Sequence, residues 1–260
     1  MKLTKQQKDD FHQNGFLIIR DFYSESEIQL VKDEINLLGK NIVKNDFNLD
    51  KKFNKKLEKK YSLLYRVLRY SIMLNKMSVL DKNILLTKQL GVKIPSVMKS
   101  CNIRMDTPSN KKLFQWHQDT SFLLGSLNAL TFWIPLTDVN KKMGSVEVIP
   151  ESHKKGFYKY KITKTNVDQK SFFSPSDLHL IDEPKNDNNK IITAKSCDLV
   201  VFYQMLLHRS TNNNSENNRY VMQLRYSDLL NKEFIDSDYP YGDNTNILFT
   251  NYKDNTNKGK

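Results

Sequence analysis

Hydrophobic positions in the first third of the chain recur at helical spacing. Between residues 24 and 43 they lie three or four positions apart, so they share one face of a helix: Ile28, Val31, Ile35, Leu38 and Ile42. Ser24 and Glu27 form a capping box at the start of this segment. The pattern predicts a long amphipathic helix whose apolar stripe packs on a core.

The other helices expected in this part of the chain are shorter. The spacing predicts them at residues 5–14, 61–74 and about 79–90. Gly15 and Gly91 are suited to end the first and the last of these helices. The lysine-rich stretch 51–60 is expected to be an exposed helix face or a loop. Residues 1–95 are therefore predicted to be mainly helical.

From about residue 97 the pattern changes to that of β-strands. Polar and apolar residues alternate at 101–106, 145–149 and 219–226, while short apolar runs occupy 16–19, 129–136, 191–194 and 199–203. Several short strands without alternating helices favour a sandwich or jelly roll, here with the preceding helices buttressing one sheet. We expect one domain over residues 1–260, with a jelly-roll core at 97–230.

Two segments interrupt or follow this core. Residues 154–190 form a long polar insertion, and a loop of this length is usually functional or disordered. It is either a lid over a pocket or a passive excursion. Residues 240–260 form a polar tail.

Composition narrows the class of protein. The mean hydropathy is −0.61, and no stretch approaches the roughly 20 apolar residues of a membrane span. The N-terminal residues lack the apolar core of a secretory signal, and the two cysteines have no zinc-site spacing. We therefore expect a cytoplasmic protein. The net charge of +12 indicates either a solvated basic surface or attraction to an anionic substrate or nucleic acid.

The candidate chemistry centres on His117 and Asp119. Side chains two positions apart on a strand project to the same face, so this imidazole and carboxylate are placed to bind one metal ion. His208, which follows the apolar run 199–203, supplies a second imidazole. Two histidines and one carboxylate form the facial triad typical of non-haem Fe(II) oxygenases. A surface hydrogen bond between His117 and Asp119 is the competing interpretation.

Arg219 opens the strand that follows His208. If the two strands are adjacent and antiparallel, the loop 211–218 brings Arg219 close to His208. A guanidinium there would bind a carboxylate in bidentate fashion.

Together, these motifs resemble the phytanoyl-CoA dioxygenase family. Three stretches carry the resemblance in order: His117-Gln118-Asp119; residues 144–153, GSVEVIPESH; and His208-Arg209-Ser210 with Asn213, Ser215 and Arg219. The last stretch matches every named position of the family's distal pattern, and the resemblance spans about residues 5–230. Cys197 and Glu151 stand where members often have glycine, which puts the geometry of two turns in doubt.

The resemblance implies a fold and a cofactor. The fold is a double-stranded β-helix, a cupin-like jelly roll with the metal at its mouth. His117, Asp119 and His208 would bind Fe(II). Arg219 and Ser210 would bind the distal carboxylate of 2-oxoglutarate. Trp133 either packs near this cosubstrate or is an ordinary core residue.

The resemblance also implies an activity. The family couples O₂ and 2-oxoglutarate to oxidation of a substrate and releases succinate and CO₂. We expect hydroxylation of a small molecule. An anionic or carrier-linked substrate is one form of this hypothesis. Asn102 and Arg104 share one strand face and are the candidate substrate contacts. The alternative for Arg104 is an ordinary basic residue on the surface.

The competing functions are a nucleic-acid-modifying oxygenase, for which no recognition motif is present, and a non-catalytic cupin-like binding protein. The sequence leaves the substrate and the oligomeric state open.

Overall fold

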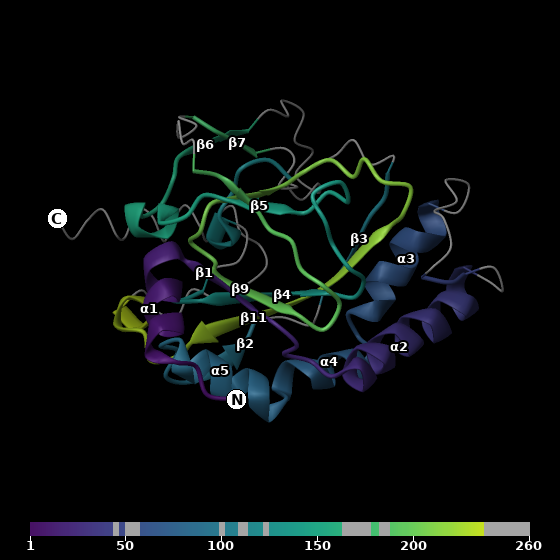
Figure 1. Cartoon of the computed structure of the whole chain (residues 1–260), viewed down its shortest axis with the longest axis horizontal. Coiled ribbons are helices and arrows are strands. Elements are labelled where there is room, and N and C mark those ends of the chain that lie inside the picture. Colours follow the sequence, from purple (N-terminus) through teal and green to yellow (C-terminus); the bar gives the residue numbers. More distant parts are fainter. Residues whose placement is uncertain are drawn as a thin grey trace.

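Two antiparallel sheets form the centre of the molecule (Figure 1). The computed structural model describes residues 1–43, 47–49, 58–98, 102–108, 114–121, 125–162, 178–181 and 188–236. The larger sheet has the order β1 (Phe16–Ile19), β9 (Leu199–Tyr203), β4 (Leu130–Pro135), β11 (Arg219–Asp228) and β2 (Pro95–Val97), with β3 (Asn102–Asp106) also paired to β11. The smaller sheet has the order β10 (His208–Ser210), β5 (Val146–Val148) and β8 (Lys190–Ile191).

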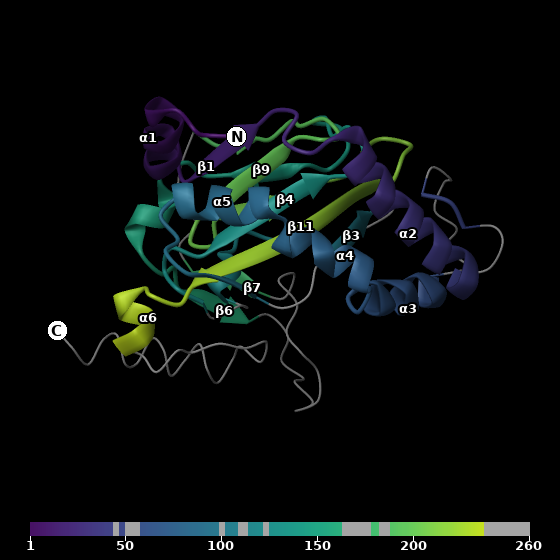
Figure 2. The ribbon, with the colours of Figure 1, turned by 90° about the horizontal axis from the view of Figure 1, so that it is seen from below.

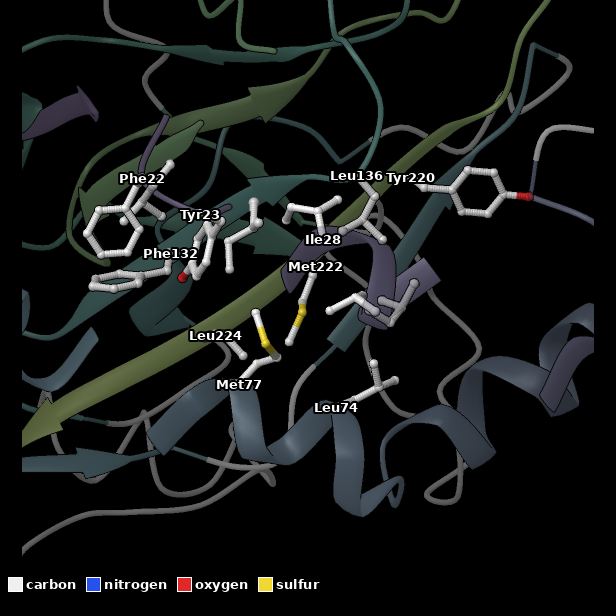
Figure 3. Close-up of a cluster of buried hydrophobic side chains, with 14 of the residues drawn as sticks. Phe22, Tyr23, Ile28, Leu74, Met77, Phe132, Leu136, Tyr220, Met222 and Leu224 are labelled. Carbon is white, nitrogen blue, oxygen red and sulfur yellow. The ribbon is translucent and has the colours of Figure 1, made fainter. Parts of the chain in front are cut away.

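The alternating pattern of β11 gives the larger sheet two different faces. Tyr220, Met222 and Leu224 point to one side and are almost completely buried. With residues of β4 and β9 they join the main hydrophobic cluster, which includes Ile28 of the long helix. Figure 3 shows this layer of aromatic, aliphatic and methionine side chains between the sheet and the helices. The opposite face of β11 carries Arg219, Val221, Gln223 and Arg225.

Helices cover the first of these faces. They are α1 (Lys5–Asn14), α2 (Glu25–Val43), α3 (Glu58–Leu68), α4 (Ile72–Lys76) and α5 (Asp81–Gln89), with α6 (Lys232–Asp236) following the last strand. Figure 2 shows α2, α4 and α5 lying across the larger sheet. The capping box expected for α2 is present, because Ser24 Oγ accepts from Glu27 N at 3.2 Å and Ser24 N donates to Glu27 Oε2 at 2.8 Å. The expectation that helices buttress one sheet is confirmed.

A second hydrophobic cluster lies between the two sheets. Trp133, Val200 and Phe202 of the larger sheet pack there with Val146 and Val148 of the smaller one. This packing joins the sheets as in a jelly roll, and it leaves the polar side chains of β3 and β11 at the edge of the same interior.

Some element boundaries differ from the sequence prediction. The helix expected over residues 61–74 is two helices, because α3 ends at Leu68 and Ser71 caps α4 by accepting from Leu74 N at 3.2 Å. The strand expected at 191–194 is shorter, and Ala194 forms only an isolated bridge with Val139.

The insertion and the tail are described only in part. The short helix η4 (Ser152–Lys155) leads into the insertion, which contains the hairpin strands β6 (Tyr160–Ile162) and β7 (Leu178–Leu180). Residues 163–177 and 182–187 of the insertion lie outside the described residues, as do residues 51–57 of the lysine-rich stretch and the tail 240–260. No helix within the described ranges has the length and apolar character needed to cross a membrane.

Candidate metal centre

Backbone pairing brings the two candidate metal-binding histidines together. His117 N donates to His208 O at 2.9 Å, and His208 N donates to His117 O at 3.0 Å. This antiparallel bridge places both side chains on one side, and the ring centroids are 4.2 Å apart. His117 lies in an isolated bridge rather than a regular strand, and Asp119 begins the short helix η3 (Asp119–Ser121). The carboxylate nevertheless turns back towards the two rings.

The two imidazoles are oriented by backbone carbonyls. Nδ1 of His117 lies 2.7 Å from Gln115 O, and Nδ1 of His208 lies 2.9 Å from Leu206 O. A carbonyl only accepts, so each Nδ1 carries the hydrogen and each Nε2 keeps its lone pair. The two Nε2 atoms lie 3.9 and 3.8 Å from Asp119 Oδ1. An ion with bonds of about 2 Å spans such separations.

Burial sets the protonation states that a metal requires. Desolvation lowers the pKa of His117 to about 3, and the neighbouring His208 adds to the effect. Desolvation likewise lowers the pKa of His208, against the opposing influence of Asp119. Burial tends to raise the pKa of Asp119, but Arg225 and the histidines outweigh it and hold that pKa well below its usual range. Neutral imidazoles and an ionised carboxylate are the forms that bind a metal ion.

Two residues that the sequence interpretation missed fix the other carboxylate oxygen. Asp119 Oδ2 accepts from Thr131 Oγ1 at 2.6 Å and lies 3.3 Å from Arg225 Nε. Thr131 and Arg225 are directly opposite each other in the β4–β11 register. The alternation of β11 carried a signal, since Arg225 shares the face of Arg219, but the sequence could not indicate which carboxylate it approaches.

Arg219 is placed differently from the prediction. Its strand, β11, belongs to the larger sheet, whereas His208 lies on β10 of the smaller sheet, so the expected pairing of the two strands is wrong. Arg219 instead lies opposite Asp106 of β3, to which its Nη2 donates a close hydrogen bond. Its guanidinium is 5.6 Å from the ring of Trp133.

One nitrogen of Arg219 remains available to a ligand. Its Nε is buried and has no hydrogen-bond partner among the described residues. An unsatisfied buried donor is costly, and a guanidinium that has used one nitrogen on Asp106 can still donate to a carboxylate from Nε. The site therefore fits an anionic molecule beside Arg219.

The remaining predicted residues have distinct positions. Trp133 is a buried residue of the cluster between the sheets and also lies near Arg219. Its packing near a cosubstrate stays a prediction. Ser210 follows His208 by two positions on β10, which places both on one face, and its N–H donates to Phe114 O at 3.0 Å.

The two candidate substrate contacts lie on β3. The Arg104 side chain is only 19% exposed, so it is not a surface residue, and its guanidinium stacks 3.9 Å from the centre of the Phe114 ring. Asn102 is half-buried on the same face and lies opposite Gln223.

Gln118 connects the metal-binding motif to the insertion. Its Nε2 donates to Gly156 O at 2.9 Å and Met205 O at 2.8 Å, and its Oε1 accepts from Tyr158 N at 3.0 Å. These contacts give Gln118 a structural role. The first residues of the insertion are thereby attached to the loop that carries His117 and Asp119.

Asn213 and Ser215 stabilise the loop that leads to Arg219. Asn213 Nδ2 donates to Asp106 O at 3.0 Å, and its Oδ1 accepts from Ser215 N at 3.1 Å. These motif residues thus secure the loop and tie it to the strand that carries Asp106.

Comparison with known proteins gives a consistent result. The sequence profile of the family described as phytanoyl-CoA dioxygenase (PhyH) matches residues 11–221. Phytanoyl-CoA dioxygenase 1 of Oryza sativa subsp. japonica is 27% identical over 261 residues, covering 87% of this chain and 89% of the relative.

Solved structures share the fold at low sequence identity. The α-ketoglutarate-dependent epimerase SnoN from nogalamycin biosynthesis has a TM-score of 0.59 at 14% identity and covers 86% of this chain and 82% of its own. HygX from Streptomyces hygroscopicus, solved with nickel and 2-oxoglutarate, has a TM-score of 0.59 at 15% identity and covers 88% of this chain and 89% of its own. The double-stranded β-helix expected from the sequence is confirmed.

The double-stranded β-helix carries a buried His–Asp–His cluster that could hold a metal ion, an arrangement typical of non-haem Fe(II) oxygenases. The chain belongs to the phytanoyl-CoA dioxygenase family, whose profile spans most of its length. It is therefore an enzyme of the iron- and 2-oxoglutarate-dependent oxygenase class.

Proposed function

We propose that the chain is a dioxygenase that hydroxylates a small molecule at a centre formed by His117, Asp119 and His208. One atom of O₂ enters the substrate and the other enters succinate, while the C1 carboxylate of 2-oxoglutarate leaves as CO₂. The observation that carries the proposal is the buried cluster itself, in which one ligand atom from each residue lies within 4.8 Å of the others.

The three residues are suited to Fe(II) and leave coordination positions open on one side. When bound there, iron activates O₂ for transfer to the substrate. The chain's own contribution is to hold two neutral imidazoles by their Nδ1 hydrogens and one carboxylate by its second oxygen. Carbonyl oxygens and Thr131 perform these tasks, and their fixed geometry lowers the cost of ordering the ligands.

The cosubstrate site is proposed at Arg219. Its buried Nε–H donates to no protein acceptor among the described residues, so the distal carboxylate of 2-oxoglutarate can accept this hydrogen bond. Ser210, on the face of His208, is proposed as a second donor to the same carboxylate. Trp133 closes the site from the side of the hydrophobic cluster and excludes water.

We favour a small-molecule substrate over a nucleic-acid substrate. SnoN has been solved with nogalamycin RO and HygX with hygromycin B, so the fold binds small molecules of this kind in those proteins. The arginines grouped by the larger sheet, Arg219 and Arg225, face aspartates in the interior and do not form an exposed basic surface among the described residues.

Anaerobic titration with Fe(II) and 2-oxoglutarate tests the proposal. We expect a weak visible charge-transfer band that requires both additions and is lost in Asp119→Ala. Arg219→Gln should retain iron binding and raise the 2-oxoglutarate concentration needed for the band by roughly tenfold to hundredfold, because a hydrogen bond between charged groups is removed.

Arg209→Gln is the matched control. Arg209 also stacks on an aromatic ring, that of Trp116, and also has a carboxylate partner, Glu147. Its side chain belongs to the opposite face of β10 from His208. A band that survives Asp119→Ala, or that never forms in the unmodified protein, contradicts the proposed function.

A further inference from the structure

Three arginines converge on the interior face of the larger sheet. Arg104 of β3 lies opposite Val221 of β11, between the positions of Arg219 and Gln223. The charges of Arg219 and Arg225 both lower the pKa of Arg104, after the larger effect of burial. Arg219 and Arg225 therefore each repel Arg104 across this face.

Only two carboxylates among the described residues face these arginines. Asp106 lies 3.6 Å from Arg104 and also receives the close hydrogen bond of Arg219. Asp119 Oδ2 lies 3.3 Å from Arg225 Nε. Sharing one carboxylate between two buried guanidinium groups leaves part of the positive charge uncompensated, which is unfavourable in a buried site.

The cofactors do not remove this excess. Three arginines against two aspartates, with neutral histidines, leave one positive charge. With a divalent iron bound the excess would be three, and with a 2-oxoglutarate dianion as well it would be one. Asp119 would then share its charge between the metal and Arg225, which would have less counter-charge.

Arg104 lies on the metal side of this face. Its guanidinium stacks on Phe114, whose ring meets the ring of His117 edge-on at 5.6 Å between centroids. Its charge also acts on His117 and His208. A group held by Arg104 would therefore lie beside the cluster of His117, Asp119 and His208.

We propose that Arg104 and Arg225 form a subsite for a compact oxyanion of the substrate, a carboxylate or a phosphate. A guanidinium binds both groups through paired N–H donors. Gln223, which accepts from Arg225 Nη2 at 3.1 Å, holds one side of the subsite. This inference rests on the proposed function and narrows its substrate to an anionic metabolite oxidised near its acidic group.

Matched pairs of probes test the subsite on the anaerobic complex with Fe(II) and excess 2-oxoglutarate. One arm compares short-chain carboxylic acids with the corresponding amides, and the other compares alkyl phosphates with the corresponding alcohols. We expect the acids of at least one arm, at concentrations up to about 10 mM, to shift the visible band without abolishing it. The neutral partners should leave the band unchanged.

Variants then assign the effect to a residue. Arg104→Gln should raise the apparent Kd of the acidic probe roughly tenfold to hundredfold, with partial recovery in Arg104→Lys and with an unchanged requirement for 2-oxoglutarate. Arg209→Gln should leave the probe response as it is.

The outcomes separate this inference from the proposed function. If no band forms with iron and 2-oxoglutarate, the proposed function fails. If the band forms but neither acidic arm shifts it, or if the amides and alcohols act equally, the subsite is overturned. A probe that abolishes the band, or an Arg104→Gln variant that weakens 2-oxoglutarate as much as the probe, assigns Arg104 to the cosubstrate and also overturns it.

Discussion

Replacing Thr131 by valine removes one hydrogen bond from the carboxylate of the metal-binding aspartate. The hydroxyl of Thr131 is fully buried and lies 2.6 Å from Asp119 Oδ2. Valine has nearly the same shape, so the substitution leaves no large cavity. The remaining contact to Oδ2 is Arg225 Nε at 3.3 Å, which is long for a charged hydrogen bond.

The size of the effect follows from this geometry. A hydrogen bond to a charged group contributes about 1.5–3 kcal/mol, which corresponds to roughly 10–150-fold in affinity. Removing a residue that orients a metal ligand typically weakens metal binding by about 10–100-fold. Because Arg225 still contacts the carboxylate, we expect the lower part of this range, about 10–50-fold.

Anaerobic titration with Co(II), a stable substitute for Fe(II), measures the metal Kd of the variant. Thr137→Val is the control. Thr137 Oγ1 is buried without a hydrogen-bond partner among the described residues, so replacing this threonine by valine removes no hydrogen bond. A folded Thr131→Val protein whose Kd stays within about threefold of the unmodified value, well below that expected loss, would refute the role given to this hydroxyl.

Three further outcomes are expected. Without metal, the free energy of unfolding should fall as the pH drops from about 6.5 towards 4, by up to about 1.4 kcal/mol per pH unit for His117. The reason is that burial lowers the folded-state pKa of His117 to about 3, so the unfolded chain binds more protons in this range. A free energy of unfolding that does not change with pH, measured by urea denaturation with a chelator present, would contradict this. Gly15→Ala should lower the melting temperature more than Gly91→Ala, because both glycines have positive φ but a Cβ at Gly15 would lie 2.4 Å from His153 Nδ1, whereas at Gly91 the nearest atom is 3.9 Å away. Asn213→Ala should raise the KM for 2-oxoglutarate several-fold while leaving the metal Kd unchanged, since it loosens the loop before Arg219; equal loss of both affinities would count against that role.

Local patterns were sufficient for much of the fold. The apolar stripe and the capping box of α2 involve residues three or four positions apart in the sequence. The same spacing places the apolar residues of α2 on the face that packs against the sheet. The alternation of β11 predicted its two faces correctly because side-chain direction has period two. The class of metal site was also readable, since His117 and Asp119 are neighbours in sequence and His208 has its own motif.

Pairings between distant strands were not readable. Arg219 and Asp106 are 113 positions apart, and nothing local indicates that β11 pairs with β3 while β10 joins the other sheet. The same holds for Thr131 and Arg225, which meet Asp119 only because β4 and β11 are adjacent. Gln118 lies between two candidate ligands in the sequence, but its partners across the insertion depend on tertiary contacts.

The proposed site is tested most directly by an anaerobic crystal structure of the protein with Fe(II) and 2-oxoglutarate. We predict a single iron bonded to Nε2 of His117, Nε2 of His208 and one oxygen of Asp119, with the distal carboxylate of 2-oxoglutarate accepting from Arg219 Nε. Iron bound by other residues, or a distal carboxylate held by Arg104 or Arg225 while Arg219 contacts only Asp106, would contradict it.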